Sequence, residues 1–400
     1  MTLSLLFLTE SFHPVLGGGE VHIRQLGRAL VEGGLRATVV TRRIDAAWPA
    51  EDDVDGIRVV RVGPPGVGRG GKYVMVPAAL SAVRRLRATT DVLVVRGTRV
   101  LGMPALALAR PLRLPVVLQP EINGELSGEV YSWGKGWGAV ARHGVRLGTA
   151  VRNRWMKRAD AFVAMSRAIE DEMRVAGIDP ARIHRIPHGV DLARFRPASV
   201  EERAALRARL GVPAADTVLT FTGRLLRGKG LETLLAVFTE LAARHAGLHL
   251  MIVGSGAGQT LSIEDVLRAQ VQSAGLSARV TFTGRVDNVD DWLRASDVFA
   301  FPSEFEALGI SLVEAAACGL PCVASRTGGI VDVVDHDVTG LLHEPGDKAG
   351  LTAGIERLLA DRPLRDRLAR AARDRAEREY DWTRSVERYR QLFGGLKRPA

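Results

Sequence analysis

Short runs of aliphatic and β-branched residues alternate with helical patterns along this chain, and the alternation begins again after Pro187. In the first half, Leu3–Leu8 is typical of a buried strand, and Glu20–Gly33 has apolar residues at helical spacing. In the second half, Thr217–Thr222 precedes a helical pattern at Leu231–His245. Strands that alternate with helices form parallel sheets with right-handed crossovers. The sequence therefore predicts an α/β fold with two doubly wound, Rossmann-like domains that face a central cleft.

Four hundred residues exceed one comfortable hydrophobic core, so two domains are the natural expectation. We place them at 1–187 and 188–378, and we expect 379–400 to form a helix that packs back on the first domain. The expected strands are Leu3–Leu8, Ala37–Thr41, Ile57–Val62, Val92–Val95, Val116–Leu118, Ala161–Ala164, a short strand within Arg182–Pro187, Thr217–Thr222, Leu248–Val253, Val280–Thr283, Val298–Ala300 and Cys322–Ala324.

The bulk composition is that of an ordinary globular protein, with 46% hydrophobic and 25% charged residues. Arginine dominates the net charge of +10, and much of it is interleaved with acids over 201–210 and 362–390. This pattern is typical of solvated helix faces. The charge alone therefore identifies no partner, and no motif that reads nucleic acid accompanies it.

Three features favour a cytoplasmic protein. Cys318 and Cys322 stand four residues apart in an apolar run, which favours buried free thiols over a disulfide framework or a metal site. The apolar N-terminus lacks a basic region, so it is interpreted as a first strand and not as a signal peptide. No stretch approaches the roughly 20 apolar residues that a membrane span needs.

The segment Phe301–Ser325 holds two carboxylates, Glu306 and Glu314, around a helix that we expect to start near Leu308-Gly309. Unpaired amides and the helix dipole attract phosphate to a helix N-terminus. A carboxylate at that point would repel phosphate, so Glu306 more naturally binds hydroxyl groups. An anion site beside carboxylates that bind hydroxyls is the arrangement that a nucleotide-sugar requires.

The first glycine cluster, Gly17–Glu20, follows the first strand and opens a helix, so its backbone could approach an anion closely. It lacks the spacing of a dinucleotide-binding fingerprint, and Thr41–Arg43 stands where an acidic residue would end the second strand. An NAD(P)-dependent enzyme is therefore disfavoured.

Two more glycine clusters follow strands of the second half. Gly223–Gly230 carries Arg224 and Lys229, which suit a diphosphate, although an exposed basic turn would look the same in isolation. Thr327–Ile330 could complete a phosphate cradle, although in isolation an ordinary strand-to-helix turn is the better interpretation. Together with the two downstream carboxylates, the basic loop points to a diphosphate site.

These elements together resemble family 4 of the retaining glycosyltransferases, which have the GT-B architecture of two Rossmann-like domains. The resemblance covers nearly the whole chain: Gly17–Glu20, Ile186–Asp191 at the domain junction, Gly223–Gly230, Glu306–Glu314 and Gly328–Leu342. It implies transfer of a sugar from a nucleotide-sugar donor to a hydroxyl acceptor, such as a lipid-linked or cell-surface glycan precursor. Domain 1–187 would be the acceptor side, and domain 188–378 would bind the nucleotide-sugar.

The resemblance also implies roles for individual residues. Arg224 and Lys229 would bind the diphosphate, and Glu306 would contact the donor sugar; these three are the expected catalytic residues. Glu314 would hold the ribose hydroxyls of the nucleotide. The other expected donor-binding residues are Gly18, Gly19, Glu121, His188, Gly254, Arg285, Val286, Leu308, Gly309, Ile310, Gly328 and Gly329.

One departure from the family concerns the donor sugar. Many members carry a His directly after the strand that matches Val116–Leu118, near the C6 hydroxyl of the sugar. This chain has Gln119, Glu121 and Asn123 in that segment and no His, and it has His188 where Asn is commoner. Either Glu121 or Gln119 takes over the sugar contact, or the C6 group of the donor differs.

We expect neither a metal nor a cofactor, because basic residues neutralise the leaving diphosphate in this family. Asp53-Val54-Asp55 and Asp335-His336-Asp337 have the form of a metal–diphosphate signature, but we interpret both as solvated surface turns. The resemblance implies front-face substitution, in which the protein positions the reactants and stabilises the leaving group. The alternatives are a nucleotide-sugar epimerase or hydrolase on the same scaffold and, less favoured, a non-catalytic binding protein.

Residues 131–158 contain seven Lys/Arg, no acid and three of the six Trp. This combination fits a segment that binds an anionic membrane surface, which would place the enzyme on the inner face of the plasma membrane. The alternative is a helix that packs its Trp inside while its arginines are solvated or face a soluble acceptor.

Overall fold

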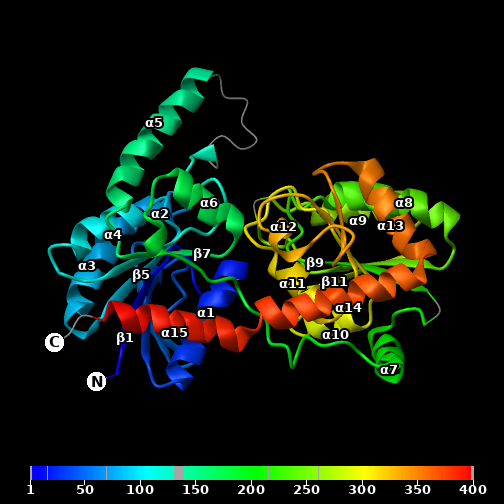
Figure 1. The fold of residues 1–400 in the computed structure, drawn as a ribbon, viewed down its shortest axis with the longest axis horizontal. Coiled ribbons are helices and arrows are strands. Elements are labelled where there is room, and N and C mark those ends of the chain that lie inside the picture. Colours follow the sequence, from blue (N-terminus) through cyan, green and yellow to red (C-terminus); the bar gives the residue numbers. More distant parts are fainter. Residues whose placement is uncertain are drawn as a thin grey trace. The chain divides into compact units, whose positions relative to one another are not determined.

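The computed structural model describes residues 2–15, 17–68, 70–129, 139–214, 216–259 and 261–397, without the side chains of 139–142 and 146. The chain folds into two compact units, one of residues 1–187 with 384–400 and one of residues 188–383 (Figure 1). Each is a parallel sheet flanked by helices, which confirms the predicted class of two doubly wound, Rossmann-like domains.

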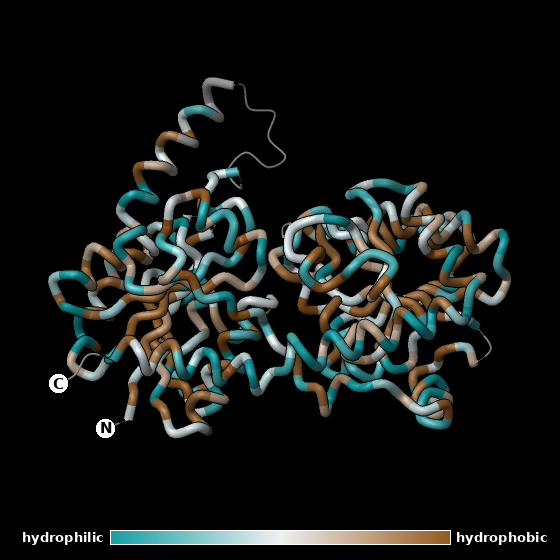
Figure 2. The backbone as a smooth tube through the Cα atoms, viewed as in Figure 1, coloured by the Kyte–Doolittle hydropathy of each residue, from teal (hydrophilic) through white to brown (hydrophobic). Residues whose placement is uncertain are grey.

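The strands of the first unit are β1 (Ser4–Leu8), β2 (Arg36–Arg42), β3 (Glu51–Val54), β4 (Ile57–Val62), β5 (Val92–Arg96), β6 (Val116–Gln119), β7 (Ala161–Ala164) and β8 (Ile183–Arg185). Its α-helices are α1 (Gly18–Glu32), α2 (Gly71–Val74), α3 (Val76–Leu86), α4 (Gly102–Ala109), α5 (Ala139–Met156), α6 (Arg167–Val175) and most of α15 (Trp382–Leu396). The sheet order is β3-β4-β2-β1-β5-β6-β7-β8, and β3 alone runs antiparallel to its neighbour. Strands β1, β5, β6 and β7 are buried along their whole length, as expected when helices cover both faces of a sheet (Figure 2).

The strands of the second unit are β9 (Thr217–Thr222), β10 (Leu248–Val253), β11 (Val280–Gly284), β12 (Val298–Phe301), β13 (Cys322–Ser325) and β14 (Leu341–His343). Its α-helices are α7 (Val200–Leu210), α8 (Leu231–Arg244), α9 (Glu264–Ser273), α10 (Val289–Arg294), α11 (Ile310–Ala317), α12 (Ile330–Val333), α13 (Lys348–Ala360) and α14 (Arg362–Glu379). All neighbours in the order β11-β10-β9-β12-β13-β14 are parallel. The loops that follow these strands therefore meet at one edge of the sheet.

All twelve strands predicted from the sequence are present, with ends that differ by at most two residues. Strands β3 and β14 were missed because β3 is an acidic edge strand without an apolar run and β14 has only three residues. The interpretation of Asp53-Val54-Asp55 as a surface turn is wrong for its first two residues. They lie in β3 and pair with β4, and only Asp55 stands in the hairpin turn, where its φ is 55°.

The C-terminal helix α15 packs against the first unit. Tyr389 accepts a hydrogen bond from Gln119 Nε2 at 3.1 Å, and Arg390 Nη2 donates to the carbonyl of Gly33 at 3.0 Å. Phe393 meets Phe7 of β1 edge-on, with 6.4 Å between the ring centroids. The end of the chain thus completes the core of the domain in which the chain begins.

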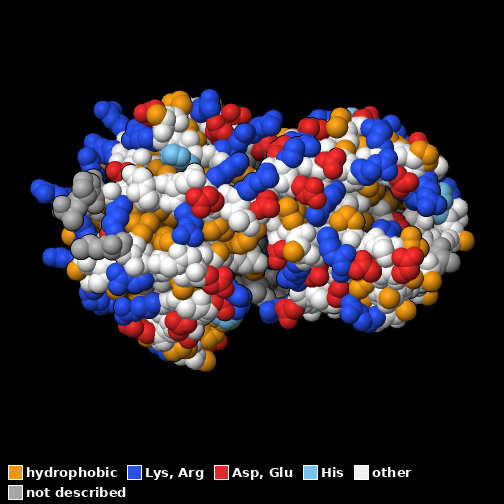
Figure 3. Space-filling view, turned by 60° about the horizontal axis from the view of Figure 1, so that its bottom comes forward, with side chains coloured by type: hydrophobic (Ala, Val, Ile, Leu, Met, Phe, Trp, Pro, Cys, Tyr) orange, Lys and Arg blue, Asp and Glu red, His pale blue; other side chains and the backbone are white. Residues whose placement is uncertain are grey.

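The surface of the described residues carries basic and acidic side chains side by side (Figure 3). On α14, Arg373 and Arg375 pair with acids one turn along the helix, Glu377 and Glu379. Arg362, Arg367, Arg370 and Arg378 of the same helix are exposed, as predicted for a solvated helix face, whereas Arg375 is buried and Arg373 is partly buried. Cys318 and Cys322 are free and buried, as predicted.

Candidate active site

Three glycines line the carboxyl edge of the sheet in the second unit, one after each of β9, β10 and β11. The amide of Gly223 donates to the carbonyl of Val253 at 3.0 Å, and that of Gly254 donates to Gly284 at 3.1 Å. Gly254 has a φ of +133°, and a Cβ there would overlap the carbonyl oxygen of Gly223. Only glycine permits this close approach of neighbouring loops.

Lys229 donates to a carboxylate oxygen of Glu306, so the basic loop after β9 is joined to the loop after β12 by an ion pair. The two loops also share a backbone hydrogen bond, from Glu304 N to the carbonyl of Gly228 at 2.9 Å. Gly230 caps α8 in the left-handed region, where a Cβ would overlap the carbonyl of Pro302. The expected phosphate-binding and sugar-binding residues are therefore brought together.

The glycine turn after β13 packs on the same loop. Gly329 N donates to the carbonyl of Glu306 at 3.1 Å, and Thr327 Oγ1 donates to the carbonyl of Glu304 at 3.1 Å. A Cβ at Gly328 would overlap the Glu306 carbonyl oxygen, and one at Gly329 would overlap that of Ala307. Both glycines are thus required by backbone packing, whatever further role they have toward a ligand.

Helix α11 begins at Ile310, within two residues of the start expected from the sequence. Gly309 is its N-cap, with a φ of +87°, and no side chain caps the first turn. The first amides of the helix are therefore available to an anion, because an N-terminal turn has no partners of its own for them. Leu308 is buried, so only its backbone could contact a ligand.

Glu314 lies on α11, one turn after its start, and burial raises the pKa of its carboxyl to about 7. Arg194 lowers this pKa through its charge, and Asp290 raises it. A half-buried carboxyl of this kind can accept hydrogen bonds from hydroxyl groups when it is ionised and donate one when it is protonated.

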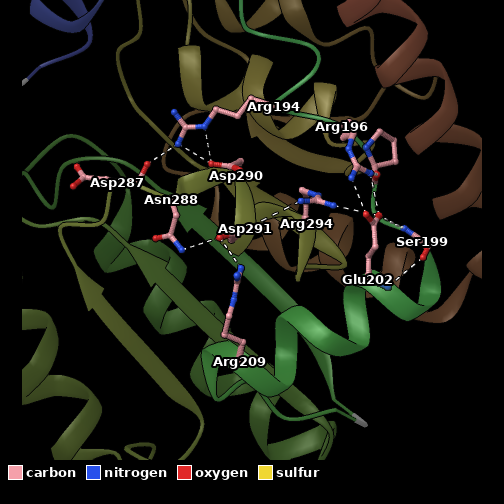
Figure 4. Close-up of polar contacts among 11 residues, drawn as sticks. Arg194, Arg196, Ser199, Glu202, Arg209, Asp287, Asn288, Asp290, Asp291 and Arg294 are labelled. Atoms are coloured by element: carbon pink, nitrogen blue, oxygen red, sulfur yellow. Dashed lines mark hydrogen bonds and ion pairs between the residues drawn. The ribbon is translucent and has the colours of Figure 1, made fainter.

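Arg194 also anchors the loop that follows Arg285-Val286 (Figure 4). Its Nη2 donates to the carbonyl of Asp287 at 2.5 Å, and its Nε donates to Asp290 Oδ1 at 2.7 Å. The network continues to Asp291, which pairs with Arg209 of α7 at 2.7 Å. The loop that follows the expected donor residues Arg285 and Val286 is thus tied to the connector after His188.

Four expected donor residues have different degrees of burial. Arg224 and Arg285 are exposed, and neither side chain has a hydrogen-bond or ion-pair partner among the described residues. Val286 packs against the core cluster of Val212, Val218, Met251 and Val253. His188 is buried at the first residue of the second unit.

In the first unit, the glycine turn and Glu121 lie together. Gly18 and Gly19 are the first two residues of α1, after the N-cap Gly17, and no side chain caps the start of this helix. A Cβ at Gly19 would lie 3.5 Å from Glu121 Oε1. Burial raises the pKa of Glu121 to about 7.

The structure distinguishes between Gln119 and Glu121, the two candidates to replace the missing His in contact with the sugar. The Gln119 side chain is buried, and its Nε2 donates to Tyr389 of α15. Glu121 keeps about a third of its side chain exposed, at 36%. Glu121 is therefore the one of the two that a ligand can reach.

Sequence reasoning missed Arg96, Arg194, Glu125 and Glu172, which hold the site loops. Arg96 ends the apolar run Val92–Val95, and a charge at the carboxyl end of a strand could have marked it. Glu125 and Glu172 lie in a loop and on a helix without any local pattern. Their function depends on backbone amides that only the fold brings near.

Two observations concern the described residues alone. None of their helices combines the length and the low polarity that a bilayer crossing requires. They also contain no group of three or more His, Cys, Asp or Glu side chains arranged to hold a metal ion. Asp335 and Asp337, from the second Asp-x-Asp pattern, instead pair with Arg375 and Arg357.

Comparisons with known proteins cover both units. The family model described as Glycosyltransferase Family 4 matches residues 16–194, and the one described as Glycosyl transferases group 1 matches residues 202–375. D-inositol 3-phosphate glycosyltransferase of Xylanimonas cellulosilytica is 30% identical over 96% of this chain and 93% of that protein.

Two solved structures are similar over nearly their whole length. Sucrose-phosphate synthase from Thermosynechococcus elongatus has a TM-score of 0.81 at 25% identity and covers 98% of this chain and 99% of that chain. The Anabaena protein Alr3699/HepE in complex with UDP-glucose has a TM-score of 0.76 at 22% identity. The match covers 98% of this chain and 100% of that chain. The chain is thus an enzyme that belongs to the family 4 glycosyltransferases and has their GT-B fold of two Rossmann-like domains.

Proposed function

We propose that the protein is a retaining glycosyltransferase that moves a sugar from a nucleotide-sugar donor to a hydroxyl acceptor. The observation that carries the proposal is the meeting of three loops in the second unit around Lys229 and Glu306. A cation, a carboxylate and the uncapped start of α11 lie on neighbouring loops there. This arrangement suits a diphosphate joined to a polyhydroxylated sugar.

The relatives support this assignment of substrate class. One of them is named a D-inositol 3-phosphate glycosyltransferase, and a structure with the same fold holds UDP-glucose. We propose that Glu314 binds the ribose of the nucleotide, that Arg224 and Lys229 bind the diphosphate, and that Glu306 contacts the transferred sugar. The remaining donor contacts would come from the glycine turns and from the backbone of Leu308–Ile310.

The mechanism that we propose is front-face substitution. The bond between the anomeric carbon and the diphosphate oxygen breaks, an oxocarbenium-like sugar forms, and the acceptor hydroxyl attacks from the same face. The hydroxyl proton passes to the departing phosphate oxygen. Lys229 and Arg224 would stabilise the growing negative charge on that phosphate, and the reaction would then need no bound metal.

We further propose that α5 binds an anionic membrane surface. Leu147, Val151 and Trp155 recur every fourth residue on this helix and are 62%, 59% and 45% exposed. They form an apolar stripe on a helix that extends away from the rest of its unit (Figures 1 and 2).

A basic side chain from a residue just after α5 lies against the stripe. Arg158 lies over the Trp155 ring, 4.3 Å from its centroid. Arg152 is not part of this face, because it donates to the carbonyl of Glu125 and to Asn153 Oδ1. Residues 131–138, with the first two Trp of the predicted segment, lie outside the described residues. We propose the cytoplasmic leaflet as the surface, because its lipids are anionic.

A panel of UDP-, GDP- and ADP-sugars, each tested for a rise in the thermal midpoint, identifies the donor, because preferential binding to the native state raises apparent stability. The sugar product is then followed by proton NMR with and without candidate acceptors. Transfer with retained anomeric configuration supports the proposal. Turnover of the donor that needs no acceptor favours the alternative, an epimerase or hydrolase, and no binding across the panel refutes both.

A further inference from the structure

Arg96, the last residue of β5, is a charged side chain that the proposed function does not use. It is 1% exposed and is the largest of the fully buried side chains. Its Nη1 donates to the carbonyl of Gly19 at 2.8 Å and lies 3.4 Å from His22 Nδ1. Its Nε and Nη2 have no hydrogen-bond partner among the described residues. A buried guanidinium is costly unless an opposite charge lies near it.

Glu121 supplies that opposite charge. Its Oε1 lies 3.9 Å from Arg96 Nε. Gly19 lies beside both groups. A Cβ at Gly19 would lie 3.5 Å from both Arg96 Nη2 and Glu121 Oε1, and one at Gly97 would lie 3.4 Å from Oε2. The two glycines thus leave room for the carboxylate beside the start of α1. Arg96 is sealed from solvent, whereas Glu121 remains accessible from one side.

Two further carboxylates, the buried Glu125 and the partly buried Glu172, hold the loop that carries Glu121. Glu125 accepts hydrogen bonds from the amides of Glu121 and Ile122 at 3.0 and 3.3 Å, and from the amide and hydroxyl of Thr98. Glu172 of α6 accepts from the amides of Gly124, Leu126 and Ser127 at 3.0, 2.9 and 2.5 Å. The backbone of the loop is therefore preorganised, and the direction of the Glu121 side chain depends mainly on Arg96.

The charges around Glu121 are unbalanced. Arg96 is the cation that lowers its pKa, whereas Glu125 on the same loop, Glu20 on α1 and Glu10 after β1 raise it, and burial raises it most. Near neutral pH, the ionisation of Glu121 therefore depends on Arg96. A carboxylate beside three other acids would repel phosphate, but its two oxygens can accept hydrogen bonds from neighbouring hydroxyl groups.

We propose that Arg96 is a positioning residue that keeps Glu121 ionised and directed outward, and that the pair forms a recognition site for two adjacent hydroxyl groups of a sugar. The assignment of the ligand as a sugar rests on the proposed function. The coupling of Arg96 to Glu121 does not, so the two claims are tested by separate measurements.

The coupling is tested by carbon-13 NMR of the glutamate carboxyl groups between about pH 5 and about pH 9, with the Glu121 signal identified by its loss in Glu121→Gln. In the wild type this signal should titrate near pH 7. In Arg96→Gln its midpoint should rise by about one pH unit or more, because the one nearby cation is lost. A midpoint that stays in place or falls overturns the proposal.

Two variants separate charge from packing. Arg61→Gln removes another arginine whose side chain is 1% exposed in the same unit, but Arg61 pairs with Asp52 and should leave the Glu121 midpoint unchanged. Arg96→Lys keeps a cation and should restore most of the wild-type midpoint. If Arg96→Gln does not fold, the Arg96→Lys variant still tests the coupling of Arg96 to Glu121. A midpoint in Arg96→Lys that has risen by a full unit shows that packing, not charge, sets the pKa and overturns the proposal.

The sugar site is tested with the donor that the nucleotide-sugar panel identifies. In Arg96→Gln the acidic limb of the profile of kcat/KM against pH should move upward, and activity should recover toward the wild-type level at about pH 9. A loss that is equal at every pH indicates a merely structural role and overturns the proposal. If no nucleotide-sugar is turned over, the proposed function fails, and the NMR titration still tests the pair.

Discussion

Lys229 and Glu306 form an ion pair that joins the loop after β9 to the loop after β12. The sequence predicts separate partners for them, a diphosphate for Lys229 and a sugar for Glu306. The pair shows that the two contacts are not independent, because the carboxylate competes with a diphosphate for the same ammonium group. In the proposed function, Glu306 would therefore tune the affinity of Lys229 for phosphate as well as contact the sugar.

Replacement of Glu306 by Gln should tighten the binding of inorganic pyrophosphate and slow sugar transfer. The ammonium of Lys229 loses its competing anion. If the ion pair contributes about 0.2–1 kcal/mol, this loss raises the affinity for pyrophosphate about 1.4- to fivefold. Calorimetric titration of both proteins with pyrophosphate measures the change.

Glu304→Gln is the matched control for that titration. Glu304 is exposed, lies two residues away in the same loop and makes no ion pair with Lys229. Glu304→Gln should change the affinity for pyrophosphate far less than Glu306→Gln does. Weaker binding of pyrophosphate by Glu306→Gln than by the wild type would show that the pair helps to bind the anion and does not compete with it.

Replacement of Gly329 by Ala should destabilise the second unit by about 1–3 kcal/mol, because the new methyl group overlaps the Ala307 carbonyl and the loops must separate. Gly247→Ala is the control, since a Cβ there meets only Asp216 Oδ1, at 3.6 Å. Thermal midpoints of the two variants measure the difference. Equal midpoints would mean that the glycine turn does not pack against the Glu306 loop.

The raised pKa of the half-buried Glu314 carboxyl should make stability depend on pH. Its pKa is raised from 4.5 to about 7, so the folded chain holds this proton more tightly than the unfolded chain does. Its contribution to stability therefore falls as the pH rises between about 4.5 and about 7. Relative to the wild type, Glu314→Gln should be more stable at pH 8 than at pH 5, as thermal midpoints at the two pH values would show. A difference that is constant or reversed would contradict the burial of this carboxyl.

Replacement of Val151 by Asp should reduce co-sedimentation with vesicles that contain phosphatidylglycerol by about tenfold or more, because the apolar stripe of α5 no longer inserts. Val200→Asp, at an exposed valine of the other unit, is the control and should not change binding. Vesicles of phosphatidylcholine alone should bind less of the wild type. Undiminished binding of Val151→Asp to the anionic vesicles would reject α5 as the membrane contact.

The fold was predictable from local patterns because apolar runs and helical periodicity mark both sheets. The edge strand β3 lacks such a run, and it was missed. The meeting of the loops that carry Lys229 and Glu306 was predictable, because both follow strands of one parallel sheet and such loops meet at its carboxyl edge. The roles of Glu306, Glu314 and Lys229 toward a ligand stay predictions. Arg96 and Arg194 were not predictable, since their partners are 25 and 96 residues away, at Glu121 and Asp290, and only the tertiary fold brings them together.

The most direct test of the account measures sugar transfer by Lys229→Ala and Glu314→Ala with the identified donor, after their thermal midpoints have shown that both variants are folded. Each substitution should lower kcat/KM by at least about 100-fold, because each would remove a proposed contact to the nucleotide diphosphate or the ribose. Full activity in either folded variant would contradict the assignment of the site.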